Sequence, residues 1–411
     1  MSVARGRATA LAFALTVGIG PVAAQDTTLI VHPRTFYYEG KNAGTANEAW
    51  TLGGWIGYRS QRFRNTWSLG ATAYGSAPLY APADGDGTFL LKPGQEGYLV
   101  LGEAFGAAQF RQHALLKVGR QVVNQGYINP SDIRMTPYTF EGVTIGGEAD
   151  SVRYLAGYLW KVKQWNSDEF ISMAARAGAA SSEAGLALIG FQLTPLPGLR
   201  VDISEQYGFD TFNTIYAKGE YRRPLDDQWT IGVGAEFTEQ RAVGDALVSN
   251  AATTKWRTRV GSARAQFFHG NLTLTTAFSV TGSGNAIQNP WGTYPGFLAL
   301  IDAPASQGFA RANEKGWLIG AVYDCSKSNA RALLVVNIAR GTGAIDAQTS
   351  ESLPDQTEYN VRIEYRVSWA ALRDPSLTIR GAFYDREDSD QLARQIHVIL
   401  NSDLAFPSRS R

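Results

Sequence analysis

Alternation between apolar and polar side chains is the feature that most limits what this chain can fold into. In residues 229–237 the odd positions are Trp, Ile, Val, Ala and Phe, whereas the even positions are Thr, Gly, Gly and Glu. Residues 272–280 and 360–367 alternate in the same way. A period of two puts successive side chains on opposite faces of an extended strand. The pattern therefore predicts an all-β protein whose strands have one apolar and one polar face.

The connections between these predicted strands alternate between short and long. Short turns are expected near residues 62–65, 110–113, 146–150, 194–198, 224–228, 269–271, 324–330 and 371–376. Long loops are expected near residues 40–48, 76–96, 121–140, 161–184, 207–213, 241–255, 283–315, 341–357 and 387–393. These connections separate about eighteen strands, and a short–long alternation is typical of transmembrane barrels with short periplasmic turns and longer extracellular loops.

A soluble β-sandwich would also alternate, so composition has to decide between the two folds. Charged residues make up only 18% of the chain, and aromatic residues make up 11%. Soluble domains average about 25% charged residues. Aromatic residues near strand ends predict an outward girdle at the membrane interfaces, formed by Trp55, Trp67, Tyr158, Trp160, Trp229, Trp317 and Tyr365. We therefore predict a transmembrane antiparallel β-barrel.

The two ends of the chain differ from the segment that alternates. Residues 1–24 combine two arginines, a short apolar run and a small-residue cleavage site, which predicts a secretory signal peptide. Residues 25–406 form the predicted barrel, and residues 407–411 form a short tail after Phe406. Cys325 is the single cysteine, so no disulfide framework, metal site or cofactor is expected. The near-neutral charge gives no sign of nucleic-acid binding.

Residues 115–145, which read LLKVGRQVVNQGYINPSDIRMTPYTFEGVTI, resemble the signature region of the OprD family of outer-membrane porins. Residues 212–225, 277–297, 310–324 and 377–388 resemble further strands and loops of that family. The resemblance implies an eighteen-stranded barrel in the outer membrane of a Gram-negative bacterium. It also implies a lumen narrowed by two inward loops, in which a row of arginines, called a basic ladder, guides carboxylate-bearing solutes.

The first candidate for an inward loop is residues 124–142. It is longer than a hairpin needs, and its apolar residues suit packing on the barrel wall. We predict that Asp132, Arg134 and Tyr138 lie at the constriction; the alternative is a surface loop in which Asp132 and Arg134 only pair with each other. The second candidate is residues 284–314, rich in aromatic residues, with Asp302 as the acidic group that would face the arginines.

Alternation also predicts which cations face the lumen. Opposite the apolar positions of their strands lie Lys117, Arg153, Arg362, Arg366 and Arg380. Arg34 and Arg59 stand where family arginines occur, and Arg394 is a further candidate for the ladder. His397 stands where the family tends to have another arginine. The alternative is that Glu236 and Glu364 pair with interior arginines and merely brace the barrel.

The predicted function is passive, substrate-preferring diffusion of small solutes, most of all carboxylates. A non-specific porin, a barrel enzyme and an adhesive barrel are the alternatives, although none of the four histidines adjoins an obvious catalytic constellation. Expected partners are the solutes, outer-membrane lipid and lipopolysaccharide, and the barrel-assembly machinery. The sequence leaves open which solute passes and whether the protein is a monomer or a trimer.

Overall fold

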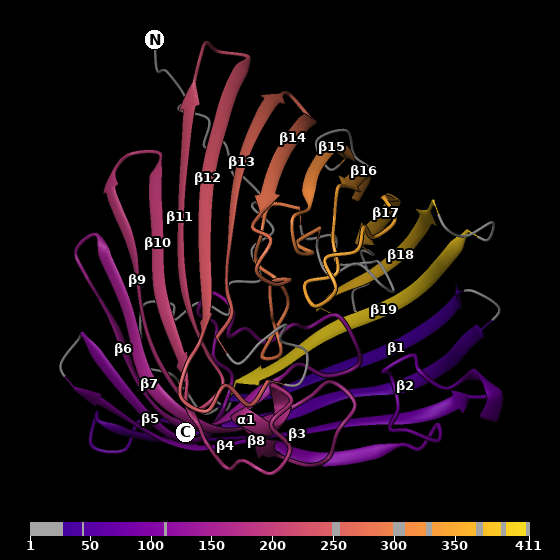
Figure 1. Ribbon diagram of the computed structural model, residues 1–411. Coiled ribbons are helices and arrows are strands. Elements are labelled where there is room, and N and C mark those ends of the chain that lie inside the picture. The colour runs from indigo at the N-terminus through magenta and orange to yellow at the C-terminus, as the bar shows by residue number, and fades with distance from the viewer. Residues whose placement is uncertain are drawn as a thin grey trace, which may run out of the picture.

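The chain folds into one closed β-barrel (Figure 1). The computed structural model describes residues 28–42, 45–110, 113–248, 255–298, 309–325, 331–366, 373–387 and 392–407. Every strand pair within these residues is antiparallel. The last strand pairs with the first, from Thr28 opposite Pro407 to Lys41 opposite Arg394, and this pairing closes the sheet without an edge.

The strands of the barrel follow chain order around its wall. They are β1 (Thr28–Asn42), β2 (Thr45–Arg59), β3 (Trp67–Tyr80), β4 (Tyr98–Phe110), β5 (Ala114–Gln121), β6 (Thr139–Ala149), β7 (Val152–Lys163), β9 (Leu186–Leu196), β10 (Leu199–Gly208), β11 (Phe212–Pro224), β12 (Trp229–Ala242), β13 (Arg257–His269), β14 (Leu272–Thr281), β15 (Lys315–Asp324), β16 (Ala332–Thr342), β17 (Gln356–Arg366), β18 (Arg373–Arg386) and β19 (Ala393–Pro407). The predicted count of eighteen barrel strands is confirmed.

Three short elements lie within the connections. The two-residue strand β8 (Ile171–Ser172) pairs with β7, and the helix α1 (Met173–Arg176) follows it directly; η1 (Ala83–Gly85) is a single 3₁₀ turn. No helix among the described residues is long and apolar enough to cross a membrane. Two connections predicted to be long are short: only residues 43–44 separate β1 from β2, and only residues 209–211 separate β10 from β11. In both places the strand alternation simply continues to the turn.

The outer face of the barrel is apolar and the inner face is polar. Large apolar side chains such as Leu99, which is 76% exposed, point outward, whereas Gln206 and Thr214 are buried inside. This is the reverse of a soluble domain, and it fits a wall that faces lipid. The outward aromatic residues include Trp67, Tyr158, Trp229, Trp317 and Tyr365, all of which are exposed.

Trp55 does not belong to that outward set, so its predicted place in the girdle is wrong. Its ring stacks on the ring of His32, which is buried, with 3.7 Å between centroids and an interplanar angle of 4°. Its neighbour Ile56 is the residue that points outward and is exposed. Trp160 is partly buried, and its Nε1 donates to Glu141 Oε1 at 2.9 Å.

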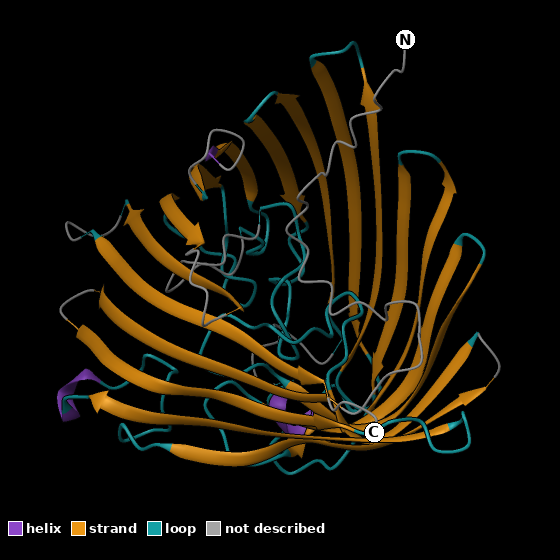
Figure 2. Cartoon of the chain, turned by 180° about the vertical axis from the view of Figure 1, so that it is seen from behind, coloured by secondary structure: helices purple, strands orange, loops and turns teal. Residues whose placement is uncertain are grey.

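The buried core of the molecule lies inside the barrel and is made largely of loop residues. Figure 2 shows these loops within the ring of strands. The main cluster contains Ile128, Tyr138 and Trp291 from two long loops, packed with Phe212 and Leu159 from the wall. Strand alternation thus supplies a wall with a polar interior, and the loops supply the apolar packing that fills part of it.

Candidate functional site: the barrel interior and its inward loops

The loop between β5 and β6, residues 122–138, crosses the interior of the barrel. At one end the hydroxyl of Tyr127 donates to Thr238 Oγ1 on β12 at 2.9 Å. Gly126 has a φ of +58°, and a Cβ there would lie 2.7 Å from Ser204 Oγ on β10, so the loop lies tightly on this wall. At the other end Asp132 reaches β1. The predicted inward position of this loop therefore agrees with its contacts on two opposite walls.

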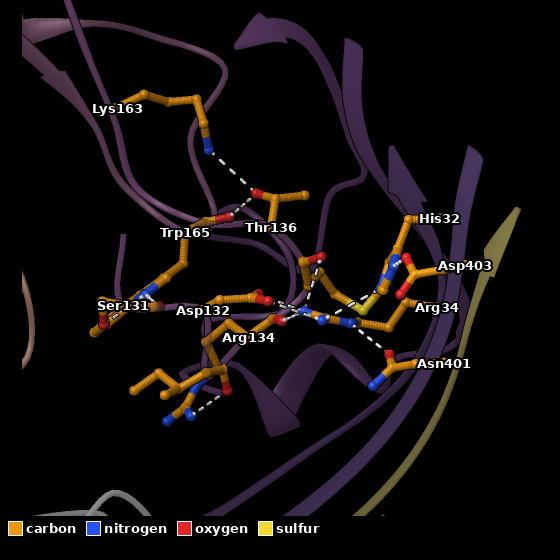
Figure 3. Close-up of polar contacts among 12 residues, drawn as sticks. His32, Arg34, Ser131, Asp132, Arg134, Thr136, Lys163, Trp165, Asn401 and Asp403 are labelled. Carbon is orange, nitrogen blue, oxygen red and sulfur yellow. Dashed lines mark hydrogen bonds and ion pairs between the residues drawn. The ribbon is translucent and has the colours of Figure 1, made fainter. Parts of the chain in front are cut away.

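Arg34 on β1 holds the far end of this loop (Figure 3). Its Nη1 and Nη2 donate to the two carboxylate oxygens of Asp132 at 2.7 and 3.1 Å, and Nη1 also donates to the carbonyl of Arg134. The Nε atom donates to Asn401 Oδ1 at 2.7 Å. Arg34 is only 6% exposed and lies over the Trp55 ring at 5.2 Å. A guanidinium with all these contacts is an anchor for the loop.

Arg134 and Tyr138 are also buried within this packing. Arg134 Nε donates to the carbonyl of Thr88 at 3.1 Å, and its guanidinium lies over the Tyr38 ring at 5.5 Å. The Tyr138 ring lies 4.8 Å from that of Trp165 and its hydroxyl accepts from Arg176 Nη2 at 3.1 Å. Burial raises the pKa of Tyr138, so the phenol stays neutral.

A buried lysine supports the loop from β7, and sequence alternation gave no signal for it. Lys163 Nζ donates to Thr136 Oγ1 at 3.1 Å and to the carbonyl of Gln164 at 2.6 Å (Figure 3). Thr136 Oγ1 in turn donates to the carbonyl of Trp165 at 2.8 Å. These bonds join the loop at 122–138 to the connection after β7.

The loop between β14 and β15, residues 282–314, also turns inward where it is described. Asn129 of the first loop accepts from the backbone N–H of Thr293 at 2.9 Å and donates to its carbonyl at 2.8 Å. Trp291 Nε1 donates to the carbonyl of Met173, and its ring stacks on Phe212 at 4.9 Å. The two loops thus hold each other inside the barrel. The predicted acidic residue Asp302 lies outside the described residues.

A second acidic group anchors this loop to the wall. Glu236 on β12 is buried, and its Oε1 accepts the backbone N–H of Phe297 at 2.7 Å. The Phe297 ring lies under the guanidinium of Arg264 on β13 at 4.3 Å, and Arg264 also pairs with Glu220. The alternative reading of the sequence paired Glu236 with an interior arginine; in the structure its Oε1 holds a loop backbone.

Three of the predicted ladder cations face the interior and carry partners. Arg59 Nη2 contacts both oxygens of Glu103 at 3.0 Å, and Arg153 Nη2 contacts Glu148 Oε2 at 2.9 Å. Lys117 Nζ lies 4.9 Å from the centroid of the Phe105 ring, which Arg59 also contacts. The sequence gave no reason to single out Glu103.

The predicted inward orientation of Arg394 is wrong. On β19 the buried positions are the odd ones, including Gln395 and His397, so Arg394 points to the outer face. There its Nη2 pairs with Glu39 Oε1 at 2.8 Å. It therefore does not belong to the interior set.

On β17 and β18 two interior arginines occupy opposed positions. Arg362 lies directly opposite Arg380 in the strand register, and Arg380 lies directly opposite His397 on β19. Both arginines are half-buried on the inner face. Arg366 is on the same face of β17, nearer the short turn, and its Nε is 3.8 Å from Glu364 Oε1. His397 is 1% exposed and stacks on Tyr38 at 4.7 Å between ring centroids.

Arg362 and Arg380 bring two cations to one level of the inner face, whereas the Arg34–Asp132 contact joins a cation to a carboxylate. Within the described residues no group of His, Cys, Asp and Glu is arranged to hold a metal ion. The chemistry offered by the interior is that of guanidinium groups, which bind carboxylates through a planar fork of donors.

A closed barrel of eighteen long strands, apolar outside and polar inside with loops crossing its lumen, defines the class of outer-membrane porins. The model of the outer-membrane porins of the OprD family matches residues 24–406. The chain therefore belongs to the OprD family, and its place is the outer membrane of a Gram-negative bacterium.

Solved structures of other porins have the same fold. OpdK of Pseudomonas aeruginosa, crystallised with vanillate, is 17% identical with a TM-score of 0.82, over 93% of this chain and 99% of that chain. OccAB2 of Acinetobacter baumannii is 17% identical with a TM-score of 0.80, over 92% and 98%. A BenF-like porin of Pseudomonas fluorescens Pf-5 is 18% identical with a TM-score of 0.79, over 94% and 100%. A comparison with curated protein sequences found no match.

Proposed function

We propose that this porin is a passive channel that prefers small carboxylate-bearing solutes. The observation that carries the proposal is the placement of Arg362 and Arg380 at directly opposed positions of neighbouring strands, both on the inner face. Two cations at one level of the inner face attract an anionic solute, and each guanidinium offers a carboxylate a planar fork of donors. The crystal structure of OpdK with vanillate, which is a carboxylate, supports a carboxylate as the solute.

The path along this wall continues on both sides of the pair. Arg386 and Tyr384 lie on the same face of β18 toward the long loops, and Arg366 lies on β17 toward the short turns. Residues four apart on a strand are about 13 Å apart. Arg366 therefore lies about 13 Å from Arg362 along the strand. A carboxylate that leaves one of these cations moves over this distance to reach the next. The loop at 122–138 and the described part of the loop at 282–314 restrict the remaining width of the lumen.

The test is efflux of a carboxylate and of its uncharged amide from liposomes that contain the purified protein. Benzoate and benzamide have nearly the same size, so their ratio reports on charge alone. We expect benzoate to leave faster, and we expect the ratio to fall toward one in Arg362→Gln/Arg380→Gln. Arg394→Gln is the control for charge loss outside the lumen, because it removes one arginine charge from the outer face.

The competing function is a non-specific diffusion porin. It predicts a benzoate-to-benzamide ratio close to one in the native protein, and no change in the double variant. That result would overturn the proposed preference while leaving the porin itself intact.

A further inference from the structure

At the end of the barrel that carries the long loops, a cavity of about 460 Å³ opens beside β17 and β18. Its lining includes Asn285 and Gln288 from the loop at 282–314, Gln348 from the loop at 343–355, and Tyr384 and Arg386 from β18. Cavities that bind small molecules have volumes of about 300–1,000 Å³. The size of this cavity therefore suits one small solute.

A continuous chain of hydrogen bonds through Glu314 joins four residues that line this cavity. The hydroxyl of Tyr384 donates to Gln356 Oε1 at 2.5 Å, and Gln356 Nε2 donates to Glu314 Oε1 at 3.0 Å. Arg311 Nη2 donates to that same Glu314 oxygen at 2.7 Å, and its Nη1 donates to the carbonyl of Pro354 at 2.9 Å. Glu314 is fully buried. The chain ties two strands and two loops together, so the cavity is held in shape before any solute arrives.

The charges around the cavity are divided between its sides. Arg386 is exposed and contributes a guanidinium on the β18 side. Asp346 contributes a carboxylate on the loop side, where the backbone N–H groups of Thr349 and Gln348 lower its pKa and keep it ionised. A solute that carries a carboxylate at one end and hydrogen-bond donors at the other matches the charges on the two sides.

The polar lining is rich in amide groups. Gln288 and Gln348 add amide donors and acceptors to those of Asn285. Asn285 is buried, and within the described part of the chain its Nδ2 has no hydrogen-bond partner. A buried amide N–H without a partner costs free energy that an acceptor on a bound molecule would recover. Hydroxyl groups are both donors and acceptors, so they match such a lining.

We propose that this cavity is a binding site for small polyhydroxy carboxylates, and that it loads the channel above the Arg362–Arg380 pair. The loading role rests on the function proposed above, whereas the binding itself does not. Arg386 and Arg380 are six residues apart on one face of β18, which is about 20 Å along the strand. A solute released from the cavity therefore has a short path to the arginine pair.

Single-channel recording in planar bilayers tests the site, with solute added on the side of the long loops. The probes share six carbons: gluconate carries a carboxylate and hydroxyls, hexanoate only the carboxylate, and sorbitol only hydroxyls. We expect gluconate to interrupt the current at lower concentration than either of the others. Arg386→Gln should raise the concentration of gluconate needed about tenfold, since hydrogen bonds to charged groups are among the strong ones. Arg64→Gln, in an exposed turn at the other end, is the matched control.

Each other outcome overturns a part of the proposal. Equal interruption by hexanoate would remove the hydroxyl preference, and equal interruption by sorbitol would remove the need for a carboxylate. An unchanged response in Arg386→Gln would show that gluconate binds elsewhere. The benzoate-to-benzamide ratio separates the two proposals, because it tests the channel without the cavity: a native ratio of one, with gluconate interruptions intact, contradicts only the function proposed above.

Discussion

Two regions of the barrel wall use arginine in opposite ways. On β1, β2 and β7, Arg34, Arg59 and Arg153 each lie against a carboxylate at 2.7–3.0 Å. On β17 and β18, Arg362 and Arg380 occupy directly opposed positions in the strand register. In the first arrangement a carboxylate balances each guanidinium charge within the protein, and these ion pairs hold strands and loops in place. The second concentrates positive charge on the inner face, where solute passes. An interior arginine therefore says little about selectivity until its neighbours are known.

The largest expected effect comes from breaking one of the arginine–carboxylate ion pairs. Asp132→Asn leaves the buried Arg34 without its carboxylate, and loss of one partner of a buried ion pair costs about 3–5 kcal/mol. We expect amide hydrogen exchange in the loop at 122–138 to speed up on the order of a hundredfold. Mass spectrometry of the purified protein measures this exchange.

Asp84→Asn is the control for that change, because Asp84 is an exposed residue of another long loop. If exchange in the loop at 122–138 were the same in both variants, Arg34 and Asp132 would not anchor the loop. The claim that arginine–carboxylate pairs hold the loops in place would then be wrong.

A smaller effect is expected when the carboxylate that balances Arg59 is removed, because this change does not move a loop. Glu103→Gln keeps acceptors for Thr72 and Tyr74 but removes the charge that balances Arg59. A unit charge at about 5 Å in water is worth about 0.8 kcal/mol to a passing ion. We expect the preference for anions over cations to rise about two- to fourfold, measured as a reversal potential in a salt gradient. A fall in that preference would contradict the role given to Glu103.

Much of this architecture could be predicted from the sequence, because strand alternation carries the orientation of side chains directly. It placed Arg362 and Arg380 on the inner face, and the short–long spacing gave the number of barrel strands. Arg394 was misplaced although the same rule excludes it, since it shares its parity with the apolar Ile396 and Val398. Trp55 was misplaced because the apolar Ile56 follows it directly, so alternation cannot decide which of the two side chains faces outward.

Pairing could not be predicted from local sequence. Arg34 and Asp132 are 98 residues apart, and Arg59 and Glu103 are 44 residues apart. Only the curvature of the barrel and the course of an inward loop bring these groups together. Lys163 was missed for a related reason, since its partners come from loops that have no periodic pattern.

The most direct test of the account compares the reversal potentials of two double variants in the same salt gradient. Arg362→Gln/Arg380→Gln removes the facing arginines, and Arg59→Gln/Glu103→Gln removes an ion pair without changing the net charge. We expect the preference for anions to fall roughly tenfold in the first variant, from two charges worth about 0.8 kcal/mol each, and to stay within about twofold in the second. Equal losses in both, or a loss only in the second, would contradict the claim that the facing arginines set the selectivity.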